Sequence, residues 1–317
     1  MKINIKEQDN NLRLDKYLNK VLKDKSRSQI QKMIKAGAVL VNQKQVLPHH
    51  FIKTNDEIVF VDEPTKTTDD TEQIKPTMIE PKLIFECKDY VVLEKPIGLL
   101  VHPTDKKETN TLADWLKEKY PKILTVGEEK YRAGIIHRLD RNVSGIMLAC
   151  KTQKMYDHLK TQFKDRSVLK EYTALVHGMM EQEVGEIDTP IGRKHDSYKM
   201  AAHPRDHGKK LKEKDKVALT KYEVVERIKN FTLIKVIIKT GRTHQIRVHL
   251  NSIGHPIAGD PIYKVNKFWK VWQKKSQLDR IFLHATKIGF NDINDNWQIY
   301  EISLPNILKN YLDEIKG

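Results

Sequence analysis

The stretch Ala133–Thr152 reads AGIIHRLDRNVSGIMLACKT, and it decides how the rest of the chain is interpreted. A polar segment, His137–Asn142, lies between two apolar runs, and apolar runs bounded by turn-forming residues are typical of buried strands. The polar segment is therefore predicted to be a loop held between two core elements. Its one acid, Asp140, has cationic neighbours, which keep a carboxylate ionised and able to act as a nucleophile or base. The alternative is that Asp140 caps a turn and pairs with Arg138 or Arg141.

Four further stretches follow a recognisable order along the chain. They are KPIGLLVHP (Lys95–Pro103), LKEYTALVHG (Leu169–Gly178), GRTHQIRVHLNSIGHPIAGDPIYK (Gly241–Lys264) and LHA (Leu283–Ala285). Together with HRLD and the Ser144-Gly145 pair, they resemble the RluA-type pseudouridine synthases, enzymes that isomerise uridine in RNA. The HRLD and GRTHQIR stretches are the most specific parts of this resemblance. One departure is Val143, because the family usually has Thr there, so a hydroxyl that helps fix the loop is missing.

The resemblance implies roles for four residues. Asp140 matches the family's catalytic aspartate and is the expected nucleophile. Arg247, the second arginine of GRTHQIR, is expected to pair with Asp140; the alternative is a contact to an RNA phosphate. Tyr172 is expected to stack on the target base and to remove the proton from carbon 5, although a tyrosine on a strand is more often a packing residue. Arg138 is expected to fill the gap left in the RNA when the target base leaves its stack.

Composition limits the class of protein. The 317 residues carry a formal net charge of +15, with 39% hydrophobic and 31% charged residues. This balance indicates a globular chain long enough for two domains, and the basicity favours RNA or DNA as partner, unless it reflects only a solvated Lys-rich surface. No apolar run approaches the roughly 18 residues of a membrane span, and the first residues lack a signal peptide's apolar centre. Cys87 and Cys150 are predicted to be core thiols of a cytoplasmic protein, which we expect to be monomeric.

The first 62 residues are predicted to form a small domain of helices and strands. Leu12–Leu22 places its apolar residues on one helical face, and Ser26 starts a second helix that continues to Lys35. Gly37 is expected to end that helix, and strands follow it. This pattern resembles the small RNA-binding module of ribosomal small-subunit protein four, called here the S-four-type domain.

The S-four-type domain is basic. Residues 1–62 hold 12 Lys and Arg against 7 Asp and Glu, a net charge of +5. Phosphate contacts of this kind give affinity and register but little choice of sequence. The alternative is a small helical docking domain. The resemblance places four residues on the face that grips RNA phosphates: Arg27, Gln29, Lys32 and Lys35.

The remainder divides into a linker and a second domain. Residues 63–80 are polar, hold two prolines and show no periodicity, so they are predicted to be a linker. Residues 81–317 are predicted to form the catalytic domain, an α+β fold with a mixed, mainly antiparallel sheet flanked by helices. In the helix that follows GRT, Ile246, Leu250 and Ile253 define the buried face, with Arg247 at its edge.

Two stretches remain open in their interpretation. The segment Lys194–Lys216 is predicted to be a basic loop, with a solvated, disordered loop as the alternative. The segment Lys264–Lys275 mixes lysines with Phe268, Trp269 and Trp272, which can stack on bases or pack on the core.

Cofactor and metal motifs are missing from the sequence. The motifs GxGxxG, Walker A, GxSxG and HExxH are all absent, and His203 and His207 are predicted not to bind metal because they lie in a loop. Isomerisation of uridine needs no redox change or energy input, so no cofactor is expected. The resemblance favours large-subunit ribosomal RNA as substrate. The alternatives are a synthase acting on transfer RNA and a catalytically silent RNA-binding ribosome-assembly factor.

Overall fold

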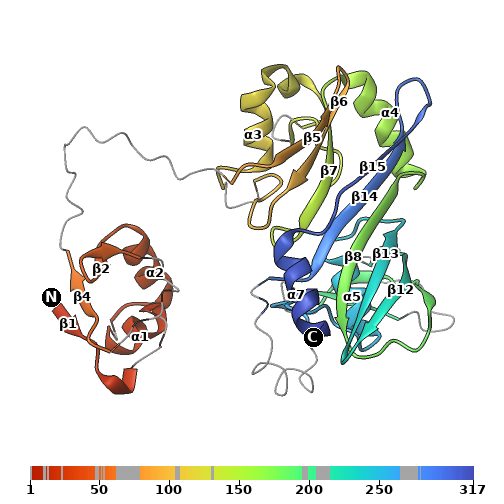
Figure 1. Ribbon diagram of the computed structural model, residues 1–317. Coiled ribbons are helices and arrows are strands. Elements are labelled where there is room, and N and C mark those ends of the chain that lie inside the picture. Colours follow the sequence, from red (N-terminus) through yellow and green to blue (C-terminus); the bar gives the residue numbers. More distant parts are fainter. Residues whose placement is uncertain are drawn as a thin grey trace. The chain divides into compact units, whose positions relative to one another are not determined.

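The computed structural model describes residues 2–9, 12, 14–22, 24–46, 50, 52, 54–61, 79–103, 108–129, 132–194, 199–204, 215–264, 278 and 280–317. The chain divides into two compact units, Met1–Lys75 and Pro76–Gly317, which are described separately (Figure 1). Most of the predicted linker, 63–80, lies outside the described residues. The same holds for much of the basic segment 194–216 and for Phe268, Trp269 and Trp272. In the described ranges, no helix is long and apolar enough to cross a membrane.

The first unit is a four-stranded antiparallel sheet with two helices. The strand order is β1-β4-β2-β3, and Leu18 and Ile34 of the two helices are fully buried in a shared core. Asn42 and Gln43 both adopt positive φ in the tight turn between β2 and β3. The elements are β1 (Lys2–Asn4), a 3-10 turn (Glu7–Asp9), α1 (Leu14–Val21), α2 (Arg27–Lys35), β2 (Val39–Val41), β3 (Lys44–Gln45) and β4 (Glu57–Phe60).

The second unit is built on one large mixed sheet. Its order is β5-β6-β7-β14-β8-β13-β12-β9, and β15 also pairs with β14. The strands are β5 (Lys82–Glu86), β6 (Tyr90–Lys95), β7 (Ser144–Cys150), β8 (Leu169–His177), β9 (Val184–Ile187), β12 (Thr220–Ile228), β13 (Phe231–Ile238), β14 (Leu283–Asn291) and β15 (Trp297–Glu301), with a separate hairpin of β10 (Ile191–Arg193) and β11 (Met200–Ala202). The helices are α3 (Leu112–Lys119), a 3-10 turn (Pro121–Thr125), α4 (Gln153–Lys164), α5 (Gln245–Ser252) and α7 (Asn306–Lys316). The mixed sheet and the α+β class agree with the prediction.

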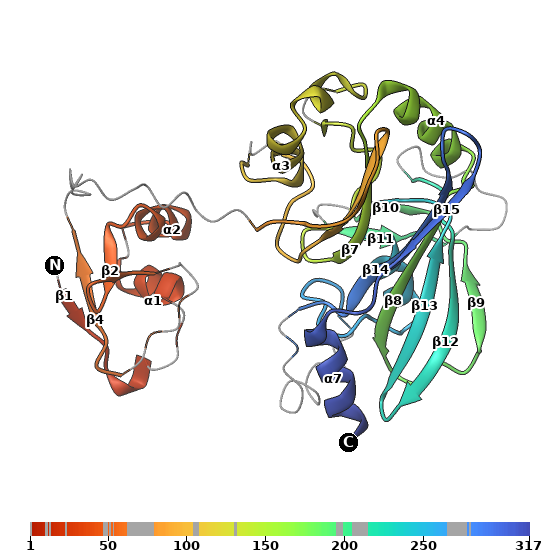
Figure 2. The same cartoon turned by 45° about the horizontal axis from the view of Figure 1, so that its top comes forward.

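The helices gather at different ends of this sheet. Figure 2 shows α3 and α4 beside the end formed by β5, β6 and β7, while α5, labelled in Figure 1, contacts β11 and β12. Local sequence fixes where the first two begin: Thr111 caps α3 in a reciprocal capping box with Asp114, and the Thr152 hydroxyl accepts from the N–H of Met155 in α4. The helix after GRT begins only at Gln245 and ends at Ser252, so Ile253 is exposed, and its predicted burial is wrong.

Two strands far apart in the sequence meet side by side at the centre of the sheet. Strands β7 and β14 pair in parallel through Ser144 with His284 and Gly145 with Ala285, while the other neighbouring pairs described in this sheet are antiparallel. Gly145 has φ of +130°, and a Cβ there would lie 2.4 Å from the backbone nitrogen and oxygen of Ala285. Only glycine allows this close approach. The close contact between β7 and β14 at Gly145 therefore fixes the position at which the preceding HRLD loop joins the sheet.

We expect Gly145→Ala to destabilise the second unit by roughly 2–5 kcal/mol, because it adds backbone strain and an overpacked contact at once. Urea unfolding monitored by circular dichroism measures this change. Gly241→Ala is the matched control, since a Cβ at Gly241 would meet nothing within 4 Å. Equal stability of the two variants would show that the close contact of Gly145 with Ala285 does not stabilise the second unit.

Candidate active site

The HRLD loop is held by main-chain atoms. The N–H of Val143 donates to the carbonyl of Asp140 at 3.0 Å, and the N–H of Gly98 donates to the carbonyl of Arg141 at 2.8 Å. In return, Nε of Arg141 donates to the carbonyl of Gly98 at 3.0 Å. These bonds tie the KPIG turn to the loop and use no side-chain hydroxyl at position 143. The valine that departs from the family pattern is buried and lines the cleft described below.

Lys95 supports the loop from beneath. Its side chain is fully buried, and Nζ donates to the carbonyls of Pro96 and Leu99 at 2.9 and 3.0 Å and to that of Arg141 at 3.4 Å. Burial lowers the pKa of Lys95 to about 7, although the Asp140 charge acts in the opposite direction. At neutral pH, Lys95 is therefore present in both its charged and its neutral form.

Other residues of the motifs support the loop without facing the cleft. His137 accepts a hydrogen bond from the N–H of Leu148 and stacks on Phe163; burial lowers its pKa to about 3, so the ring is neutral. The hydroxyl of Ser144 accepts from Nη2 of Arg280 at 2.6 Å and lies 2.8 Å from Nδ1 of His284, the histidine of LHA. These groups anchor both ends of the loop in the sheet.

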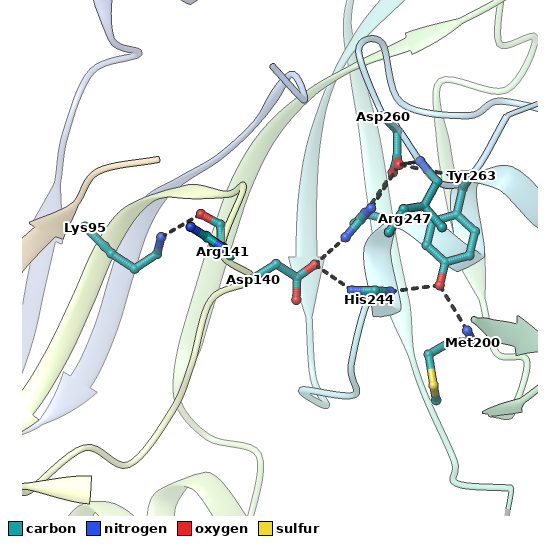
Figure 3. Close-up of polar contacts among 9 residues, drawn as sticks. Lys95, Asp140, Arg141, Met200, His244, Arg247, Asp260 and Tyr263 are labelled. Atoms are coloured by element: carbon teal, nitrogen blue, oxygen red, sulfur yellow. Dashed lines mark hydrogen bonds and ion pairs between the residues drawn. The ribbon is translucent and has the colours of Figure 1, made fainter. Parts of the chain in front are cut away.

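Arg247 joins two carboxylates. Its Nη1 donates to Oδ2 of Asp140 at 2.9 Å, while Nε and Nη2 donate to Oδ2 and Oδ1 of Asp260 at 2.7 and 2.9 Å (Figure 3). The side chains of Arg247 and Asp260 are 4% and 0% exposed, whereas Asp140 is 19% exposed. Sequence periodicity had placed Arg247 at the edge of the buried face of its helix, but the structure buries it completely.

Asp260 holds the guanidinium in a fixed orientation. Its Oδ1 also accepts from the backbone N–H groups of Ile262 and Tyr263, at 2.8 and 3.1 Å. Burial alone would lower the pKa of Arg247, but the hydrogen bonds and charges of Asp260 and Asp140 outweigh it and raise that pKa. The guanidinium is thus permanently charged, and its remaining nitrogen, Nη1, donates to Asp140.

Tyr172 comes from the sheet and lines the same cleft as Asp140. It sits on β8, opposite Val236 of β13 and Ala285 of β14, and its side chain is buried. Burial, together with the Asp140 charge, raises the pKa of the phenol. Tyr172 therefore keeps its proton in the free protein, which suits a stacking surface better than a ready base.

One cleft collects the predicted site residues of the second unit. Arg138, Asp140, Tyr172 and Arg247 all line it, with Arg138 exposed at its rim. Three groups near Asp140 were missed by sequence reasoning: His244, Asp260 and Tyr263. The GDPIY stretch that contains two of them was noticed, but nothing in its spacing shows that Asp260 reaches an arginine 13 residues earlier.

The four predicted RNA-binding residues of the first unit all belong to α2. The side chains of Arg27, Lys32 and Lys35 lie outside the described residues. Gln29 is exposed, and its side-chain oxygen accepts from the N–H of Ser26, whose hydroxyl accepts from the N–H of Gln29. Gln29 therefore helps to cap the helix, and the RNA-binding role of the set stays a prediction.

Metal and redox groups are limited in the part of the chain that the structure describes. There, no three His, Cys, Asp or Glu side chains are placed to hold a metal ion. Cys87 and Cys150 are both free thiols. Cys150 is buried in the core as predicted, whereas Cys87 is only half-buried at its edge. The side chains that line the cleft include a carboxylate, guanidinium groups, a phenol and an imidazole.

Comparisons with known proteins show the family of this chain. The model of the RNA pseudouridylate synthase family matches residues 89–252, and the S4 domain model matches residues 12–58. An uncharacterized RNA pseudouridine synthase of Aquifex aeolicus is 36% identical over 304 residues, covering 94% of this chain and 92% of its own.

Two further relatives extend the comparison. The ribosomal large subunit pseudouridine synthase D of Pseudomonas aeruginosa is 35% identical over 251 residues, covering 79% of this chain and 73% of its own. The solved structure of human RNA pseudouridylate synthase domain containing 4 aligns with a TM-score of 0.58 and 26% identity, covering 74% of this chain and 92% of its own. The family match spans more than half of the chain and includes the HRLD loop, Tyr172 and α5. The chain thus belongs to the RNA pseudouridylate synthase family and is an RNA pseudouridine synthase with an S-four-type domain at its N-terminus.

Proposed function

We propose that this pseudouridine synthase modifies uridines of large-subunit ribosomal RNA and that Asp140 is its nucleophile. The observation that carries the second part is the guanidinium of Arg247, which is anchored on Asp260 and donates its remaining edge to Asp140. Support for the substrate comes from relatives named for the large ribosomal subunit, such as the Pseudomonas aeruginosa enzyme. The cytoplasmic location and the monomeric state stay predictions.

The reaction breaks the bond between ribose carbon 1′ and uracil N1 and forms a bond from the same carbon to uracil carbon 5. Carbon 5 loses a proton and N1 gains one, so the atoms and electrons balance without a cofactor. A carboxylate nucleophile divides this rearrangement into two easier steps through a covalent intermediate. Asp140 is suited to this role because Arg247 holds it in an ion pair and it is still partly exposed to the cleft.

Tyr172 and Arg138 serve the substrate in this proposal. Tyr172 offers its ring as a stacking surface beside Asp140, and its protonated phenol becomes a base only if substrate binding provides an acceptor for its proton. Arg138, exposed at the rim, fills the space that the target base leaves in the RNA.

The two parts of the chain divide binding from chemistry. Residues 1–62 form the RNA-binding module, residues 63–80 the linker and residues 81–317 the catalytic domain. The compact unit Pro76–Gly317 has its own hydrophobic core, separate from that of the first unit. Arg27, Gln29, Lys32 and Lys35 of α2 contact RNA phosphates in this proposal.

We expect Asp140→Asn to abolish pseudouridine formation while RNA binding persists. Loss of the covalent catalyst lowers the rate by many orders of magnitude, whereas the amide preserves the shape of the cleft. Release of tritium from RNA labelled at uracil carbon 5 measures turnover, and filter binding measures affinity. Asp157→Asn, an exposed change on α4, is the matched control. Turnover by Asp140→Asn near the wild-type rate would exclude Asp140 as nucleophile.

The substrate is tested by comparing a deletion strain with the parent. Chemical mapping of pseudouridine across all RNA should show sites lost from large-subunit ribosomal RNA. Restoration by the wild-type gene, but not by the Asp140→Asn gene, ties those sites to this cleft. Losses confined to transfer RNA would favour the alternative substrate.

We expect a chain that begins at Pro76 to retain activity with a raised KM and a shallower dependence of binding on salt. The first unit carries a net positive charge, and each phosphate contact removed lowers the slope of log affinity against log salt by about one. RNA affinity of the full chain and of the shortened chain is measured at salt concentrations from about 50 to about 300 mM, a range that includes physiological salt. Unchanged affinity and slope would show that the S-four-type domain has another role.

We expect Arg247→Lys to lose most activity at saturating RNA, because lysine cannot reproduce a guanidinium that spans two carboxylates. Leaving Asp260 buried without its bidentate partner should also cost roughly 3–5 kcal/mol of stability. Arg227→Lys is the matched control, since Arg227 also makes three contacts, to Met180, Glu181 and Glu183, but at the surface. A flattened salt slope with an unchanged saturated rate would instead assign Arg247 to an RNA phosphate.

A further inference from the structure

A histidine with an unusual backbone stands beside the proposed nucleophile. His244 precedes α5 with φ of 57° and ψ of 20°, the left-handed region, and its side chain makes no capping bond to the helix. Residues other than glycine rarely adopt this conformation, and such positions concentrate at functional sites. Here the conformation places the ring in the cleft, with Nε2 3.8 Å from Oδ2 of Asp140 and the side chain 20% exposed (Figure 3).

The other ring nitrogen of His244 is fixed by Tyr263. Nδ1 of His244 lies 2.8 Å from the hydroxyl of Tyr263, and that hydroxyl accepts a hydrogen bond from the N–H of Met200 at 3.1 Å. Burial raises the pKa of Tyr263, so the hydroxyl keeps its proton. Within the described ranges, Nδ1 of His244 is the acceptor placed to receive that proton. The Tyr263 hydroxyl therefore donates to Nδ1.

This contact sets the tautomer of the histidine. Burial lowers the pKa of His244, assisted by the Arg247 charge and opposed by Asp140, so the ring is neutral near neutral pH. A neutral imidazole whose Nδ1 accepts a hydrogen bond carries its one proton on Nε2. The Tyr263 ring is itself held in place by two neighbours. It packs edge-on against the His244 ring at 79°, and its centroid lies 5.2 Å from the guanidinium carbon of Arg247.

The Nε2–H group is thus a donor turned toward the reacting position. Its contact with Asp140 at 3.8 Å is longer than a hydrogen bond, and Oδ2 of Asp140 already accepts from Arg247. Besides the ring oxygen bonded to carbon 1′, a uridine that presents this carbon to Asp140 places two acceptor oxygens nearby, the ribose 2′ oxygen and uracil O2. A fixed donor there acts where charge changes as the bond to uracil breaks.

We propose that His244 is a further catalytic residue, which donates a hydrogen bond from Nε2 to an oxygen of the target uridine. Tyr263 is the positioning residue that selects the donor tautomer. The inference rests on the proposed function, because it assumes that the ribose of the target meets Asp140. His244 transfers no proton in this role and forms no covalent bond.

The first test compares two amide substitutions of His244. His244→Asn suits the left-handed backbone but places its amide near Nδ1, away from the substrate, so we expect kcat to fall about 10²-fold. His244→Gln carries an N–H donor close to the position of Nε2 and should recover at least about tenfold over Asn. RNA affinity should stay unchanged in both. Wild-type kcat in the Asn variant, or greater activity for Asn than for Gln, would overturn the donor role.

The second test identifies the oxygen with modified substrates. RNA with 2′-deoxyuridine or 2-thiouridine at the target position is used in single-turnover assays with wild-type enzyme and His244→Asn. A bond to the ribose oxygen predicts that the loss in the variant shrinks to within about threefold on the deoxy substrate. A bond to O2 predicts this shrinkage on the thio substrate, because sulfur is a weak acceptor. An undiminished loss on both substrates would refute a contact to either oxygen.

The third test reads the tautomer directly. Long-range nitrogen–proton correlation spectra should show the proton of His244 on Nε2 in the full chain, with the signal assigned by its absence in His244→Asn. Tyr263→Phe should redistribute this proton and lower kcat about tenfold with little change in KM, which a packing role would not do. A proton on Nδ1 in the wild-type protein would overturn the inference.

Asp140→Asn in the same assays separates the two levels of interpretation. If Asp140→Asn is inactive and His244→Asn retains full activity, the role of His244 fails while the proposed nucleophile stands. If Asp140→Asn is active, the proposed function itself fails.

Discussion

The buried guanidinium of Arg247 is the interaction on which the cleft depends. Two buried charges in a low dielectric are stable only when their hydrogen bonds are fully satisfied, and Asp260 meets this condition with two bonds from Arg247 and two from backbone N–H groups. The arginine is therefore oriented before any substrate arrives. Its remaining N–H group holds the carboxylate of Asp140 without burying it. One ion pair therefore provides rigidity, and the other leaves Asp140 accessible from the cleft.

The residues of the cleft come from separate elements that meet at the sheet. Asp140 comes from a loop that enters β7, while Arg247 and Asp260 come from α5 and the turn after it. The parallel contact of β7 with β14 at Gly145 brings the HRLD loop to the middle of the sheet, where β8 supplies Tyr172. Residues separated by more than a hundred positions thus meet because two strands approach as closely as glycine permits.

Local sequence predicted much of this architecture. The two helices of the first unit, α1 and α2, and the glycine at position 37 after the second helix follow from short-range patterns that a single sequence displays. The family resemblance pointed to Asp140, Tyr172 and Arg247, and the structure brings these three together.

What could not be predicted depends on distant contacts. Periodicity extended the helix after GRT to Ile253, and the structure ends it at Ser252 with Ile253 exposed. In the sequence Asp260 is one acid in a turn. Its pairing with Arg247 depends on how α5 packs in the folded chain, which the sequence alone does not show. Position 143 shows the same limit, because the sequence suggests a lost hydroxyl. In the structure, the loop is fastened by carbonyl and amide groups that every residue carries, and by Lys95 beneath it. A side chain at position 143 then needs only to fill the apolar wall of the cleft, and a buried valine does so.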